Sequence, residues 1–180
     1  MISKVFDAAY PPLTEPDGFA GVLGYIGKTG FTPHVWTPAE WRRFEHLRQF
    51  PCYVPDLAAD PAGEAKIAVD AAEALGWARF PEPDTRTIIC DTETNIVPGW
   101  YAAFAATVAE LGFIAVNYGS LYYAAQNLAS NLWAASWDGN PHLEAGQTIR
   151  AHQYMAEHTI DFSVIDEWLL NRGGVGPRKG

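Results

Sequence analysis

Asp91 and Glu93 lie two positions apart at the end of the apolar segment TIIC (87–90). On a β-strand, residues two positions apart point to the same face and lie about 6–7 Å apart. Two carboxylates at that distance repel each other when both are ionised, so we expect one pKa to rise while the other stays low. Such a difference suits glycoside hydrolysis, in which one carboxyl group protonates the leaving oxygen and the other stabilises positive charge at the anomeric carbon.

The acidic pair has two other interpretations. A lone Asp-x-Glu also occurs at solvated strand ends, but the apolar run before this one predicts a buried central strand, which tolerates such acids only where they face water, a partner or a ligand. A metal site is the second alternative, because Asp7 and Asp161 also lie on or beside predicted strands and four carboxylates can bind Mg²⁺ or Ca²⁺. No Asp-x-Asp-x-Asp-Gly loop is present and the histidines do not pair at ligand spacing. We therefore expect no metal and no cofactor.

Short strands and helices alternate along the chain. Thr37-Pro38 and Asp60-Pro61 are helix-start signals, because the first residue of each pair caps a helix that proline begins. The hydrophobic pattern predicts strands at 5–10, 21–26, 50–57, 85–93, 113–119, 131–137 and 149–155, and helices at 37–49, 64–77, 100–112, 120–130 and 162–172. This alternation predicts parallel strands joined by right-handed crossovers.

A closed β/α barrel and an open doubly wound sheet both fit this alternation. The chain has 180 residues, whereas a full eightfold barrel usually needs at least about 200. A barrel must therefore be abbreviated, and the absence of a helix pattern between 131–137 and 149–155 agrees with that. We expect an α/β fold, an irregular TIM-like barrel forming one domain over residues 1–172, followed by a flexible Gly-rich tail over 173–180.

The charge and composition of the chain restrict the classes of partner that it can bind. The chain carries 12 Lys and Arg against 21 Asp and Glu, a net charge of −9, which disfavours nucleic-acid binding. No apolar run reaches the roughly 18 residues of a membrane span, and the first residues lack the pattern of a signal peptide. We expect a chain made in the cytoplasm without a signal peptide, with no nucleic-acid or membrane partner.

Cys52 and Cys90 lie in apolar runs and are expected to be reduced core residues.

Several segments, in order, resemble glycoside hydrolase family 25, the N-acetylmuramidase lysozymes of phage lysins and bacteria, and the related glycoside-hydrolase-like domains of unknown function. The matching segments are FDAAY (6–10), IICDTE (88–93), VNYGS (116–120), LWAASW (132–137), HQYM (152–155) and IDFSVID (160–166). The resemblance covers most of residues 5–166. It implies an irregular β/α barrel with fewer than eight helices, which cleaves the β-1,4 bond between N-acetylmuramic acid and N-acetylglucosamine in peptidoglycan without a metal.

The resemblance also implies a role for each acid. Glu93 matches the proton donor of the family, Asp91 matches the second acid of its Asp-x-Glu, and Asp7 and Asp161 match the acids that complete a four-carboxylate cleft. The chain departs from the family where VFDAAY replaces the more usual Gly-x-Asp-x-Ser and where His152 replaces a common Trp. These departures bring it closer to the uncharacterised relatives.

Four further residues are candidates for substrate binding. Tyr118 ends a predicted buried strand, Trp137 can stack on a sugar ring, and Tyr53 can substitute for the aromatic residues that many family members carry after the third strand. Gln153 and Tyr154 alternate faces, so only one of them points inward. We expect His152 and His158 to be a solvated loop pair rather than a general-base pair.

The sequence therefore predicts a lysozyme-like glycoside hydrolase of the phage-lysin type that acts on the cell wall. Its partner is peptidoglycan or a related amino-sugar glycan. The alternative is a catalytically silent barrel that binds carbohydrate at a cell surface or forms part of an assembly such as a phage virion. A metal-dependent sugar deacetylase or phosphodiesterase is a weaker third possibility.

Overall fold

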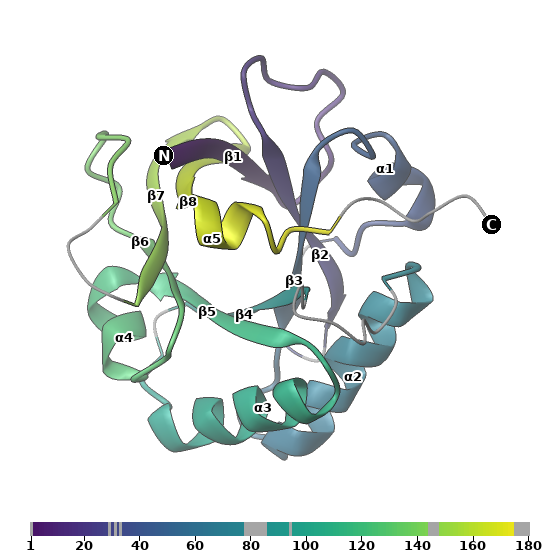
Figure 1. Cartoon of the computed structure of the whole chain (residues 1–180), viewed down its shortest axis with the longest axis vertical. Coiled ribbons are helices and arrows are strands. Elements are labelled where there is room, and N and C mark those ends of the chain that lie inside the picture. Colours follow the sequence, from purple (N-terminus) through teal and green to yellow (C-terminus); the bar gives the residue numbers. More distant parts are fainter. Residues whose placement is uncertain are drawn as a thin grey trace.

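The computed structural model describes residues 2–28, 30, 32, 34–77, 86–93, 95–143 and 148–174. Its eight strands form a closed barrel (Figure 1). In chain order these strands are β1 (Ile2–Ala8), β2 (Gly21–Lys28), β3 (Arg48–Val54), β4 (Thr87–Glu93), β5 (Ile114–Ser120), β6 (Leu132–Ala135), β7 (Ile149–Glu157) and β8 (Ile160–Asp166). The predicted fold class, an irregular TIM-like α/β barrel, is confirmed.

The strands follow one another around the barrel in chain order. Each of β1 to β6 is parallel to the next strand, whereas β8 runs antiparallel to both β7 and β1 and closes the sheet. The prediction of a helix over 162–172 was wrong for its first half, because residues up to Asp166 pair with two neighbouring strands. Only the short helix α5 (Glu167–Leu170) follows, and the Asp166 carboxylate caps it by accepting the Leu169 N–H at 2.8 Å.

Four other helices of the described chain lie between the strands, and the helix-start signals of the first two are confirmed. They are α1 (Pro38–Arg42), α2 (Pro61–Ala74), α3 (Pro98–Glu110) and α4 (Leu121–Gln126). Thr37 and Glu40 form a reciprocal capping box at α1, and Asp60 caps α2 by accepting the Gly63 N–H at 2.8 Å. Helix α1 is shorter than predicted, because turns follow it and β3 already begins at Arg48.

Alternate strand residues form two apolar layers. The inner layer fills the barrel and includes Val5, Leu23, Phe50, Cys52, Ile89, Val116, Trp133, Ala151 and Ile165. The outer layer packs strands against helices, and α2 and α3 lie side by side along one side of the barrel (Figure 1). Cys90 belongs to the outer layer, and both cysteines are buried and unpaired as expected.

Helix α5 closes one end of the barrel. It follows the end of β8, which pairs with the start of β1 at Ile2, and its Leu169 side chain packs into the inner layer. The opposite end, where β1 to β7 finish, is therefore the open mouth at which a site can form.

The chain continues past α5 along the outside of the barrel. Gly174 forms backbone hydrogen bonds of 2.7 and 2.8 Å with Gln49, so this part of the predicted tail is attached to β3. Residues 175–180 of that tail lie outside the described residues. Within the described ranges, no helix combines the length and apolarity needed to cross a membrane.

Candidate functional site

The structure brings the four predicted acids together at the open mouth of the barrel. Asp7 is near the end of β1, and Asp91 and Glu93 are at the end of β4. Asp161 begins β8, and since β8 is antiparallel its first residues lie at the end where the other strands finish. The reversed last strand therefore adds its acid to the same mouth.

Asp7 and Asp161 form one half of this group. They are direct partners in the β1–β8 ladder. Burial raises the pKa of Asp7 well above its usual range, and the charges of Asp161 and Asp91 raise it further. Burial also raises the pKa of Asp161, against the effects of the Gln153 amide and the Asp7 carboxyl group, which lower it. Asp7 therefore holds its proton to a higher pH than a free carboxyl group does, beside the less buried Asp161.

Asp91 and Glu93 form the other half, with a geometry that the sequence did not predict. The β4–β5 register shifts between them, so a bulge at Thr92 separates two residues that a regular strand would place on one face. Asp91 is 4% exposed, whereas Glu93 is exposed at the rim. Burial, followed by the charge of Glu93, raises the pKa of Asp91 to about 7. The buried member of the pair is thus the one whose pKa rises.

The bulge depends on a close backbone contact with β5. Glu93 has a φ of 47°, in the left-handed region that non-glycine residues seldom adopt, and its N–H donates to Asp91 Oδ1 at 3.0 Å. A Cβ on Gly119 would lie 2.4 Å from the Glu93 carbonyl oxygen. Glycine at 119 therefore permits the backbone path that turns Glu93 toward the rim.

A buried amide network supports the same bulge from outside the barrel. Asn117 donates to Cys90 O at 3.2 Å and to Thr92 Oγ1 at 3.0 Å. Asn127, from the end of α4, donates to Asn117 Oδ1 at 3.0 Å and accepts the Val97 N–H at 2.5 Å. These positioning residues were not singled out from the sequence, because outward-facing amides carry no periodic signal.

Two tyrosines and a glutamine surround the acids. The Tyr118 hydroxyl donates to Gln153 Oε1, so Gln153 is the member of its pair that points inward. Tyr25 packs against the inner layer, and burial and the Cys52 thiol raise its pKa, as do the nearby Asp91 and Asp7. Tyr25 was missed in the sequence, although it lies two residues after the inward Leu23 and so shares its face.

Of the predicted substrate-binding residues Trp137 and Tyr53, the structure places only Trp137 at the barrel mouth. Trp137 is 51% exposed and, together with Glu93 and Tyr118, lines a pocket of about 180 Å³ at the mouth. Tyr53 lies on the outer face of β3, where its hydroxyl donates to Glu64 at 2.9 Å and its ring packs near Phe104. The assignment of Tyr53 to the cleft was wrong, because its neighbour Cys52 occupies the inward position of that strand.

The acidic group has no cationic partner among the residues that the structure describes. Within the described part of the chain, none of the four carboxyl groups forms an ion pair with lysine, arginine or histidine. The mouth is therefore a partly buried site of negative potential, suited to positive charge that develops on a bound molecule.

Comparison with known proteins identifies the architecture. No protein-family model and no curated protein matches the sequence. Among solved structures, an uncharacterized B. stearothermophilus protein superposes with a TM-score of 0.76 at 16% identity, covering 96% of this chain and 100% of that one. A family 25 glycosyl hydrolase from Bacillus anthracis gives 0.67 at 12% identity, over 96% and 93% of the two chains. The bacterial lysozyme from Streptomyces coelicolor gives 0.61 at 13%, over 86% and 87%. The chain therefore has the fold of the family 25 glycosyl hydrolases.

Proposed function

We propose that the chain is a glycoside hydrolase that cleaves β-1,4 bonds of peptidoglycan at the cell wall. The observation that carries this proposal is the group of four carboxyl groups at the barrel mouth, three of which have raised pKa values. None of the four is paired with a cation in the described part of the chain. The sequence motifs that resemble family 25 supply the substrate class. The shared fold with a bacterial lysozyme supports the same class of activity.

The two acids of β4 lie in contrasting environments, with Glu93 exposed at the rim and Asp91 buried. Glu93 lines the pocket, so it is the group able to protonate the leaving oxygen. Asp91 lies deeper and is held by the Glu93 N–H. Its carboxylate would stabilise positive charge at the anomeric carbon, or orient the 2-acetamido group if that group attacks this carbon. Because the raised pKa belongs to Asp91, Glu93 acts as the acid only if a proton shared by the pair passes to it when the leaving oxygen is bound.

The remaining groups position the sugar. The exposed face of Trp137 offers a stacking surface beside Glu93. Asp161, half-buried at the mouth, can accept hydrogen bonds from sugar hydroxyls. The raised pKa of Asp7 reduces the negative charge beside Asp161. The hydrogen bond from the Tyr118 hydroxyl to Gln153 Oε1 holds these two side chains in place at the barrel mouth.

A second candidate is a barrel that binds wall glycan without cleaving it. The observation that favours it is the size of the pocket beside Glu93, about 180 Å³, which is below the roughly 300–1,000 Å³ of most ligand sites. A disaccharide would then have to lie across the rim rather than enter the pocket.

The experiment that separates these candidates is incubation of the protein with purified peptidoglycan, with reducing sugar and co-sedimented protein both measured. Release of new reducing ends supports the hydrolase. Co-sedimentation without release favours the binding barrel. Absence of both, across peptidoglycans of several types and across pH 4 to 8, contradicts both candidates.

A further inference from the structure

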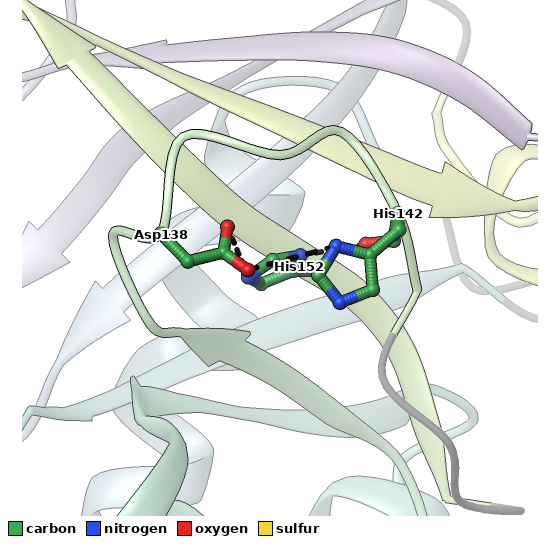
Figure 2. A group of neighbouring side chains, drawn as sticks. All are labelled: Asp138, His142 and His152. Atoms are coloured by element: carbon green, nitrogen blue, oxygen red, sulfur yellow. Dashed lines mark hydrogen bonds and ion pairs between the residues drawn. The ribbon is translucent and has the colours of Figure 1, made fainter.

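A second cluster of potential ligands lies outside the barrel, after the end of β6. It consists of Asp138 and His142 from the β6–β7 loop and His152 from β7 (Figure 2). Each offers one ligand atom, and these atoms all lie within 4.8 Å of one another. In Figure 2 the three side chains point toward one another beneath the loop.

The hydrogen bonding of the His152 ring resembles that of a metal-binding histidine. Its side chain is fully buried, and its Nδ1 lies 2.6 Å from the backbone carbonyl oxygen of His142. A carbonyl only accepts, so Nδ1 carries the proton and the neutral ring has its lone pair on Nε2. Donation of the other ring N–H to a carbonyl is the usual support of a metal-bound imidazole. The expectation that His152 lies in a solvated loop was wrong, because β7 includes it.

The Nε2 atom of His152 lies near the other two ligands. Nε2 lies 3.9 Å from Asp138 Oδ1, and His142 Nδ1 lies 3.7 Å from Asp138 Oδ2. Ligand atoms around a tetrahedral Zn²⁺ lie roughly 3.4 Å apart, given bonds of about 2.0–2.1 Å. A small inward movement of the loop would therefore complete the geometry. Asp138 and His142 are both exposed, so an ion can enter from solvent.

Among the contacts between described residues, two hydrogen bonds must change when a cation binds. Ser136 Oγ lies 2.5 Å from His152 Nε2 and donates to it, so the hydroxyl must rotate away or present its oxygen as a fourth ligand. His142 Nδ1 also lies 3.1 Å from the carbonyl oxygen of Asn140, and binding at Nδ1 would place the ring proton on the other nitrogen. Neither change disturbs the barrel strands.

We propose that Asp138, His142 and His152 form a binding site for a divalent transition-metal ion, best represented by Zn²⁺. Two imidazoles and one carboxylate are ligands that suit Zn²⁺, whereas Mg²⁺ and Ca²⁺ require oxygen ligands. The proposal departs from the expectation, drawn from the sequence, that the chain binds no metal.

The ion would tie the β6–β7 loop to β7. Asp138 directly follows Trp137, which lines the pocket with Glu93. A cation bound here would therefore fix the loop segment that presents Trp137 at the barrel mouth. Its role is structural, because the three ligands lie on the outer side of β7 and the four acids lie at the mouth.

The test is calorimetric titration of the untagged, chelator-treated full chain with ZnCl₂, alongside CaCl₂. The expected result is one Zn²⁺ per chain, no Ca²⁺ binding, and a higher Tm with Zn²⁺. Asp138→Ala and His142→Ala should each weaken Zn²⁺ binding by at least about 100-fold, no less than the loss of a supporting partner costs. Both residues are exposed, so these variants avoid the folding defect that a change at the buried His152 risks.

The matched control is His46→Ala. His46 is another exposed histidine paired with a carboxylate, that of Glu15 at 2.9 Å, and its removal should leave Zn²⁺ affinity unchanged. Absence of Zn²⁺ binding by the unaltered chain would overturn the proposal. Equal affinity in the unaltered chain, Asp138→Ala and His142→Ala would also overturn it. Because the readout is binding rather than sugar release, either failure leaves the proposed hydrolase untouched.

Discussion

Asp7 of β1 and Asp161 of β8 lie directly opposite each other in the antiparallel ladder between these two strands. Two carboxyl groups placed in this way cannot both ionise without strong repulsion, and burial strengthens that effect. The raised pKa of Asp7 lessens this repulsion, because its carboxyl group keeps a proton to a higher pH than a free carboxyl group does.

This pairing predicts that Asp7→Asn stabilises the protein at neutral pH. The folded pKa of Asp7 is raised, whereas the unfolded chain releases this proton near pH 3.9. The free energy of unfolding of the unaltered chain should therefore fall as pH rises above about 4, because only the unfolded state then ionises freely. Denaturant unfolding at pH 4 and pH 7 should show a larger gain from Asp7→Asn at pH 7.

The control for this substitution is Asp70→Asn, on the exposed side of α2, which should give no pH-dependent gain. A gain from Asp7→Asn of equal size at both pH values would contradict the account of a buried proton.

Activity should decrease as pH rises through about 7. The Asp91–Glu93 pair must carry one proton to protonate the leaving oxygen, and the pKa of Asp91 is raised to about 7 by burial and by Glu93. The pH profile of kcat/KM on soluble peptidoglycan fragments measures this directly. An increase in kcat/KM between pH 7 and pH 9 would be incompatible with a shared proton.

Gly119→Ala should reduce both stability and activity. A new Cβ would lie 2.4 Å from the Glu93 carbonyl oxygen, so the bulge must shift, at a cost of about 1–3 kcal/mol in the free energy of unfolding. Gly99→Ala is the control, because its Cβ would meet no atom within 4 Å. If Gly119→Ala retained full stability and turnover, the close contact would not be what positions Glu93.

Asn127→Ala should weaken the support of the bulge from α4. It leaves the Val97 N–H and Asn117 Oδ1 without their partner, and about 2–3 kcal/mol of unfolding free energy should be lost. Gln126→Ala removes an adjacent amide that bonds only to Tyr122 O, and should cost less than about 0.5 kcal/mol. Chemical denaturation of both variants gives the comparison, and equal losses would exclude a special role for Asn127.

Much of the fold could be predicted because strand periodicity and helix caps are local signals. Asp7 was placed correctly within the first strand and Asp91 at the end of a buried strand, and capping at Thr37 and Asp60 located two helices. Strand β8 could not be recognised from periodicity, because FSVIDEWLL also carries a helical spacing of apolar residues and only pairing with β1 and β7 decides between them.

The site was harder to predict, because it depends on backbone irregularity and on contacts distant in sequence. The bulge at Thr92 separates Asp91 from Glu93, and nothing in Asp-x-Glu reveals it. The proposed metal ligands come from a loop and a strand, so the spacing of Asp138, His142 and His152 matches no local motif.

The most direct measurement is reducing-sugar release from purified peptidoglycan by the unaltered chain, Glu93→Gln and the exposed control Glu110→Gln. The account predicts release by the unaltered chain and by Glu110→Gln. It predicts a loss of at least about 100-fold in Glu93→Gln, the lower range of what general acid catalysis contributes, with an unchanged Tm. Normal release by a folded Glu93→Gln variant would contradict the assignment of Glu93 as the acid.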